Sequence, residues 1–103
     1  MKHLRVATYG ITGGTFAEIA DKAKAEMLPK FQDQPGFIRY GLADLGNKMC
    51  LSISLWETRE QADRAAPFAA EWVRENLSDK VELKANDTGD LAFFVGAKEA
   101  VTV

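Results

Sequence analysis

One stretch in the middle of the sequence constrains the fold more than any other. Two alternating apolar runs, 37–45 and 49–55, flank a Gly46-Asn47 pair. This pattern predicts a β-hairpin with a tight turn. Trp56 ends the second run, and the Thr-x-x-Gln sequence that follows is a capping box, which starts a helix. A hairpin that leads directly into a helix is therefore the centre of the predicted fold.

The flanking segments supply the remaining elements. Residues 3–9 alternate and predict a first strand, and a second capping box at Thr15 starts a helix whose apolar positions recur at helical spacing. The next helix is expected from about Arg59 to Leu77, where Pro67 should kink it or divide it into two short helices. Residues 79–87 are polar and weakly patterned, and the apolar run Leu91–Gly96 is the predicted last strand.

The predicted order of elements is β-α-β-β-α-β, which places the chain in the α+β class. Right-handed crossovers then favour a ferredoxin-like arrangement, a four-stranded antiparallel sheet with both helices on one face. A chain of 103 residues is long enough for one modest core and too short for two. Residues 1–103 are therefore expected to form a single domain.

The strand at 49–56 has two faces that both lack charge. Its odd positions are large and apolar, its even positions are small, and Trp56 closes it. Because a sheet face that is exposed to water normally carries charged residues, both faces of this strand are predicted to be buried. A second copy of the same sheet is the simplest cover, so we expect a homodimer through the sheet face.

Composition excludes several classes of partner. The net charge of −2 and the pI near 5.4 argue against nucleic acid, since phosphate binding needs clustered Lys and Arg. No apolar run has the roughly 18 residues of a membrane span, and no signal-peptide pattern opens the sequence. The lone Cys50 fits a reducing compartment and is expected to be a buried, inert thiol. We therefore expect a cytoplasmic protein.

The chain resembles the antibiotic-biosynthesis-monooxygenase-like domains of the dimeric α/β-barrel superfamily. The resemblance rests on Pro35-Gly36-Phe37, on the strand end Leu55-Trp56-Glu57-Thr58 that leads into a helix, and on the chain length. It implies that two sheets pair as a dimeric α/β barrel. It also implies an activity among those of the family, which include cofactor-free oxygenases of polyketide quinols and haem-degrading monooxygenases. Fold alone gives a weak warrant for any one of these.

The haem-degrading branch does not fit the residues. That branch typically has an Asn on the first strand, a Trp at the end of the third and a His on the second helix. Trp56 matches the Trp, whereas Ala7 lies at or near the Asn position and no histidine follows His3. Because haem needs an axial ligand, haem degradation is not expected. No Cys or His cluster has metal-ligand spacing either, so neither a metal nor a cofactor is expected.

The candidate substrate-binding residues are aromatic, hydroxylic or cationic: Tyr9, Arg39, Tyr40, Ser52, Ser54, Trp56, Phe68 and Trp72. Small serines beneath a helix that bows at Pro67 would leave a cavity, with Trp56 at its border.

Each candidate also has a simpler interpretation. Trp56 is equally suited to be a packing anchor, the two serines to let a helix approach, and the tyrosines to place hydroxyls at a wet edge. Arg39 is suited to pair with an anion or to reach solvent at an edge strand. His3 is expected at the surface.

Two function classes remain open. The first is a cofactor-independent monooxygenase that acts on a small hydrophobic aromatic, quinol-like substrate; no catalytic residue is named for it. The second is a non-catalytic dimeric α/β-barrel protein that binds a small ligand. An oxygenase of this kind needs an enclosed pocket with a polar group aimed at the substrate oxygen, whereas a binder needs only the pocket.

Overall fold

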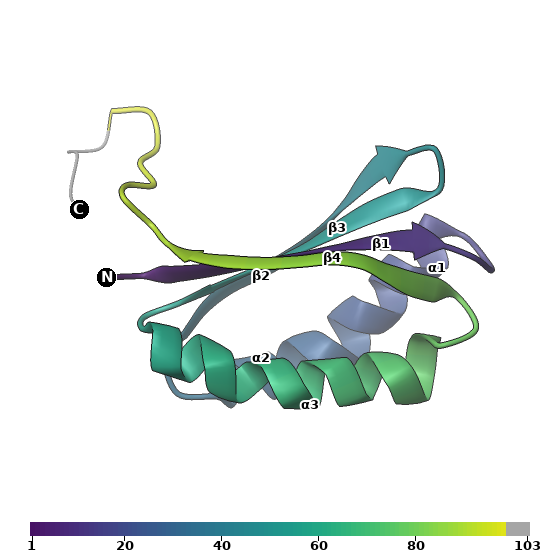
Figure 1. Cartoon of the computed structure of the whole chain (residues 1–103), viewed down its shortest axis with the longest axis horizontal. Coiled ribbons are helices and arrows are strands. Elements are labelled where there is room, and N and C mark those ends of the chain that lie inside the picture. The colour runs from purple at the N-terminus through teal and green to yellow at the C-terminus, as the bar shows by residue number, and fades with distance from the viewer. Residues whose placement is uncertain (99–103) are drawn as a thin grey trace.

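The sheet and the helices follow the predicted order. The computed structural model of the chain describes residues 1–98. Its elements are β1 (His3–Ile11), α1 (Phe16–Lys22), η1 (Ala23–Met27), α2 (Leu28–Gln32), β2 (Phe37–Gly46), β3 (Met49–Trp56), α3 (Arg59–Leu77) and β4 (Val81–Asp90). The four strands form one antiparallel sheet in the order β2-β3-β1-β4. Both helical segments lie on the same side of this sheet (Figure 1), so the ferredoxin-like prediction is confirmed.

The first helical segment begins where the capping box predicts. The Thr15 hydroxyl accepts a hydrogen bond from the Glu18 backbone N–H over 3.2 Å. A π-helical turn, η1, joins α1 to α2. The buried side chains of this segment recur every four residues, at Ile19, Ala23, Met27 and Phe31. Four-residue spacing drifts around a helix of 3.6 residues per turn, and the wider π turn reduces that drift.

The hairpin forms as predicted, but its turn lies one residue further along the chain. The two loop residues are Asn47 and Lys48, with φ of 52° and 59°, and Gly46 before them also has a positive φ of 78°. Two successive positive φ angles are the requirement of a type I′ turn. Gly46 pairs with Met49 after an irregularity in β2, which is why it belongs to the strand.

Helix α3 is continuous, so of the two alternatives predicted for Pro67, a kink or a division of the helix, the division is wrong. Pro67 lies inside the helix and is exposed. The missing hydrogen bond leaves the carbonyl of Asp63, an exposed residue, for water to satisfy. No helix of the described residues 1–98 is both long enough and apolar enough to cross a membrane.

The predicted last strand is wrong as well. β4 is the polar segment Val81–Asp90, and Leu91–Gly96 lies outside the sheet. β4 is an edge strand held by its ladder to β1, and only Val81 among its side chains is buried. Charged residues are characteristic of edge strands, so apolar alternation was the wrong criterion here.

His3 is buried rather than exposed, which corrects the sequence-based expectation. It is only 3% exposed, and its Nδ1 lies 2.7 Å from Oδ1 of Asp90. Its Nε2 is hydrogen-bonded to the hydroxyl of Thr88. The imidazole therefore ties the start of β1 to the end of β4 and supports the edge strand.

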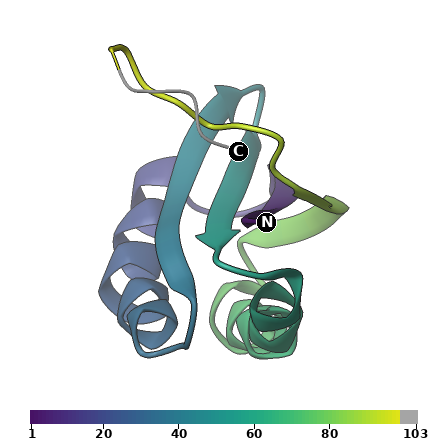
Figure 2. The ribbon, with the colours of Figure 1, turned by 90° about the vertical axis from the view of Figure 1, so that its left-hand side faces the viewer.

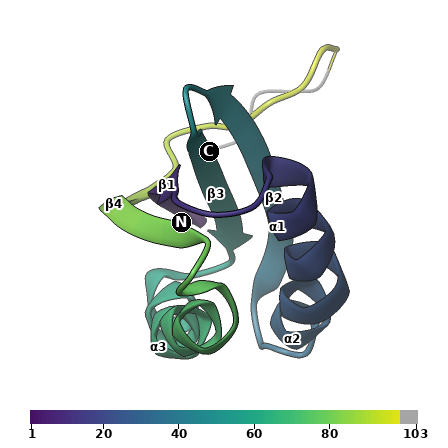
Figure 3. The same ribbon diagram turned by 90° about the vertical axis from the view of Figure 1, so that its right-hand side faces the viewer.

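The core lies between the helices and the sheet, which Figures 2 and 3 show from two ends. Its centre is Phe31, whose ring contacts those of Phe37, Tyr40, Trp56 and Phe68 at centroid distances of 5.8, 4.9, 5.5 and 5.7 Å. Three of these four contacts are edge-to-face, a geometry that aromatic pairs favour.

The other face of the sheet carries no helix. Register pairs place Leu4 beside Leu55 and Val6 beside Ile53 on this open face. Ile53 is 37% exposed, and Phe94 from the segment after β4 is 73% exposed. The open face is therefore apolar at its centre, where Ile53 is exposed in the single chain and Leu55 is only 7% exposed.

Candidate active-site cavity

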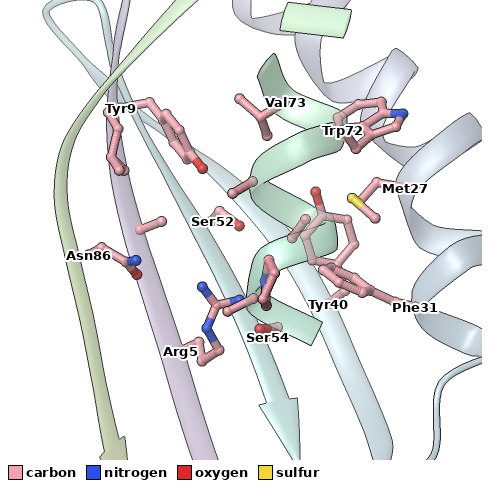
Figure 4. A pocket seen from close by; sticks show the side chains of 16 residues that line it. Arg5, Tyr9, Met27, Phe31, Tyr40, Ser52, Ser54, Trp72, Val73 and Asn86 are labelled. Atoms are coloured by element: carbon pink, nitrogen blue, oxygen red, sulfur yellow. The ribbon is translucent and has the colours of Figure 1, made fainter. Parts of the chain in front are cut away.

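A cavity of about 310 Å³ lies between α3 and the sheet (Figure 4). Its polar lining comes from all four strands: Arg5, Tyr9, Tyr40, Ser52, Ser54 and Asn86. Its apolar lining comes mainly from the helices and includes Met27, Phe31, Trp72 and Val73. The volume lies at the lower end of the range that small-molecule sites occupy, so the cavity suits a small ligand.

Small residues on α3 create this space. Ala66, Ala69 and Ala70 face the cavity where longer side chains would fill it. Pro67 also lines the cavity, but the helix remains continuous around it. The cavity lies between α3 and the sheet as predicted, and the alanines of α3 add to the room that the small serines of β3 leave.

Tyr40 presents a neutral phenol to the cavity. Burial raises the pKa of Tyr40 to about 12, while a hydrogen bond with the Ser52 hydroxyl acts in the opposite direction. The Phe31 ring packs edge-to-face against the Tyr40 ring. The Phe31 ring therefore orients the Tyr40 side chain, whose hydroxyl remains protonated at neutral pH.

Arg5 and Tyr9 lie on the same strand, and each affects the pKa of the other. Burial raises the pKa of Tyr9, and the neighbouring Arg5 charge partly offsets that rise. Burial lowers the pKa of Arg5, but a guanidinium remains protonated at any physiological pH. The cavity therefore combines one cation with two neutral phenols.

Five predicted site residues line the cavity, namely Tyr9, Tyr40, Ser52, Ser54 and Trp72. Phe68 instead packs against Phe31 in the core. Arg39 is exposed and borders a hollow on the open face together with Leu4 and Phe94, so it does not reach the cavity.

Trp56 does not line the cavity, contrary to the prediction that it forms a wall. Its side chain is 0% exposed, and its indole Nε1 donates a hydrogen bond to the Ser54 hydroxyl over 2.9 Å. The rings of Phe31 and Phe37 pack against it edge-to-face. Trp56 is thus a packing anchor whose partner Ser54 touches the cavity.

No protein-family model matches the sequence, and no curated protein matches it. Solved structures do match. SnoaB, a cofactor-independent oxygenase from Streptomyces nogalater, superposes with a TM-score of 0.70 at 16% identity, over 95% of this chain and 98% of that chain.

Two further structures give the same picture. A candidate antibiotic biosynthesis monooxygenase from Chloroflexus aurantiacus J-10-fl has a TM-score of 0.66 at 13% identity, over 93% of this chain and 98% of that chain. A dimeric ferredoxin-like protein from an uncultured marine organism has a TM-score of 0.70 at 15% identity, over 93% of this chain and 100% of that chain. The chain has the antibiotic-biosynthesis-monooxygenase-like fold. At these identities the likeness concerns the fold and not the activity.

Sequence reasoning missed two polar cavity residues, Arg5 and Asn86. Strand alternation was sufficient to find Arg5, because it lies four residues before Tyr9 on β1 and therefore shares its face. Asn86 was hidden because β4 was not recognised as a strand. In the part of the chain that the structure describes, His, Cys, Asp and Glu form no group of three or more able to hold a metal ion.

Proposed function

We propose that this protein is a cofactor-independent monooxygenase that acts on a small hydrophobic aromatic, quinol-like substrate bound between α3 and the sheet. The observation that carries the proposal is the cavity itself, in which apolar and aromatic walls surround several hydroxyl groups. Walls of this kind hold a ring and exclude water, while hydroxyls fix the ring oxygens.

The reaction needs no electrons from a cofactor. A quinol and O₂ give a hydroxyquinone and water: one oxygen atom enters a ring C–H bond, the other leaves as water, and the quinol supplies all four electrons. Tyr40 and Ser52 are the groups we assign to hydrogen-bond one ring oxygen, because both line the cavity from the neighbouring strands β2 and β3. Trp72 and Val73 are the walls against which the ring would pack.

We further propose that the protein is a homodimer joined through the open face of the sheet. Leu4, Ile53 and Leu55 form an apolar surface there that no helix covers. The dimeric ferredoxin-like neighbour supports a second copy as the cover. Two-fold pairing would also bury Phe94, which borders the same surface.

A second candidate function is binding without catalysis. Among the described cavity residues, Tyr9 and Tyr40 both have raised pKa values, so neither is poised to accept a proton at neutral pH. A binder needs no such base. In an oxygenase, by contrast, a proton of the substrate would have to pass to water at the mouth of the cavity.

Oxygen uptake distinguishes these functions. Purified protein is mixed with 1,4-naphthohydroquinone in an oxygen electrode, and the rate is compared with autoxidation without protein. Ala69→Trp fills the cavity, whereas Arg64→Gln changes an exposed residue of α3 and serves as the control. The oxygenase predicts a protein-dependent rate that survives in the control and disappears in the filled variant. Binding without any acceleration would favour the second function.

A further inference from the structure

Arg5 lies at a position where its guanidinium loses part of its hydration, which is unfavourable for a cation. It lies on β1, a central strand of the sheet, between Ser54 on β3 and Thr88 on β4. Its side chain is half-buried and projects from the sheet towards α3, with the guanidinium directed into the cavity (Figure 4). A charged group taken out of water needs a partner to offset the loss of hydration.

The described residues supply no such partner. Across residues 1–98, no salt bridge and no hydrogen bond joins the Arg5 guanidinium to another side chain. Asp63 on α3 acts on Arg5 only through space, and its carboxylate lies 3.7 Å from Nε of Arg59. The Ser54 hydroxyl beside Arg5 already accepts the indole N–H of Trp56.

The surroundings of Arg5 are otherwise neutral. Tyr9 and Tyr40 keep their protons because burial raises the pKa of each, and Asn86 carries no charge. The cavity therefore has a single cation with free N–H donors on one side and apolar walls on the other. The complementary molecule has a ring for the walls and an anionic oxygen for the guanidinium.

We propose that the cavity binds an aromatic molecule that carries an ionised acidic oxygen, a carboxylate or a phenolate, and that Arg5 is the residue that holds it. This inference rests on the proposed function only in using the same cavity. It also deepens that function, because a cation beside a ring oxygen favours the phenolate. A phenolate is the electron-rich form of a quinol that gives electrons to O₂.

Binding without oxygen tests this inference. Tryptophan fluorescence, to which Trp56 and the cavity residue Trp72 both contribute, is followed under anaerobic conditions while 2-naphthoate or its neutral isostere 2-naphthamide is added. Charge-assisted hydrogen bonds are about twice as strong as neutral ones, so we expect naphthoate to bind about tenfold or more tightly than naphthamide. A titration of bound 2-naphthol should show its ionisation at lower pH than in free solution.

Variants of Arg5 identify the residue responsible. In Arg5→Gln the preference for naphthoate should vanish while the affinity for naphthamide stays within about twofold; Arg64→Gln should keep the full preference. If Arg5→Gln does not fold by circular dichroism, Arg5→Lys keeps the charge but loses the planar fork, and the preference should be reduced without being abolished.

The outcomes separate this inference from the proposed function. Equal affinities for naphthoate and naphthamide combined with an unshifted ionisation of bound naphthol, no binding of any of the three probes, or a preference that survives in Arg5→Gln would each overturn the inference. A preference for naphthoate together with no acceleration of oxygen uptake would overturn the monooxygenase and leave the anion site standing. A lowered pKa of bound naphthol without a preference for naphthoate would identify the phenolate, rather than the carboxylate, as the recognised group.

Discussion

The indole Nε1 of Trp56 donates a hydrogen bond to the Ser54 hydroxyl over 2.9 Å, and both side chains are buried. This bond joins the core to the cavity, because Ser54 also lines the cavity whereas Trp56 does not. The tryptophan at the strand end therefore supports the site from behind. Its indole N–H is occupied within the protein and is not free to hold a ligand.

Loss of this acceptor should destabilise the protein. Ser54→Ala leaves the buried indole N–H without a partner, which costs about 1–3 kcal/mol of unfolding free energy. Urea denaturation of the wild type, Ser54→Ala, Trp56→Phe and the double variant checks this. In the Trp56→Phe background the serine substitution should cost far less, since no N–H remains. Equal costs in both backgrounds would show that the bond contributes nothing.

Gly36 should be intolerant of a side chain. Its φ is +80°, and a Cβ there would lie 1.8 Å from the Gln61 Oε1 atom on α3. Because the positive φ strains an alanine and the Gln61 side chain must also move aside, Gly36→Ala should lower the unfolding free energy by about 2 kcal/mol. Gly41→Ala is the matched control, since a Cβ there meets nothing within 4 Å. Thermal unfolding that ranks the two variants equally would contradict this account.

Ionisation of Tyr40 should lower the unfolding free energy at high pH. The pKa of Tyr40 is raised to about 12 in the folded chain, above the value of about 10 expected when unfolded. The unfolded state therefore releases its proton first. The contribution of Tyr40 to the unfolding free energy is fully present below about pH 10. It falls by about 1.4 kcal/mol per pH unit up to about pH 12. Denaturation across this range should show a shallower fall in Tyr40→Phe than in the wild type; an unchanged slope would be contrary evidence.

Local patterns predicted the hairpin, the helix caps and the buried stripe of the first helical segment, because neighbouring residues determine these features. β4 was missed because backbone hydrogen bonds to β1 hold it, and these leave no apolar pattern. The environment of His3 was missed because its partners lie 85 and 87 residues away in sequence. Arg39 was chosen over Arg5 because a charge in an apolar run draws attention regardless of the face to which it points.

The proposed dimer predicts a response to charge on the open face. Ile53→Asp places a carboxylate on an exposed apolar surface, so the single chain should still fold while the dimer dissociates. Light scattering at micromolar concentration should give a dimer for the wild type and a monomer for Ile53→Asp. Glu71→Ala, a change on the exposed side of α3, should leave the dimer intact. A monomeric wild type would contradict the proposal.

The most direct measurement locates a bound probe by nuclear Overhauser effects from its ring protons to methyl groups. With 2-naphthoate as the probe, we expect contacts to Ala66, Ala69 and Ala70, which line the cavity on α3. Contacts to Leu4, Ile53 and Leu55 on the open face, with none to the three alanines, would contradict the claim that the ligand site lies between α3 and the sheet.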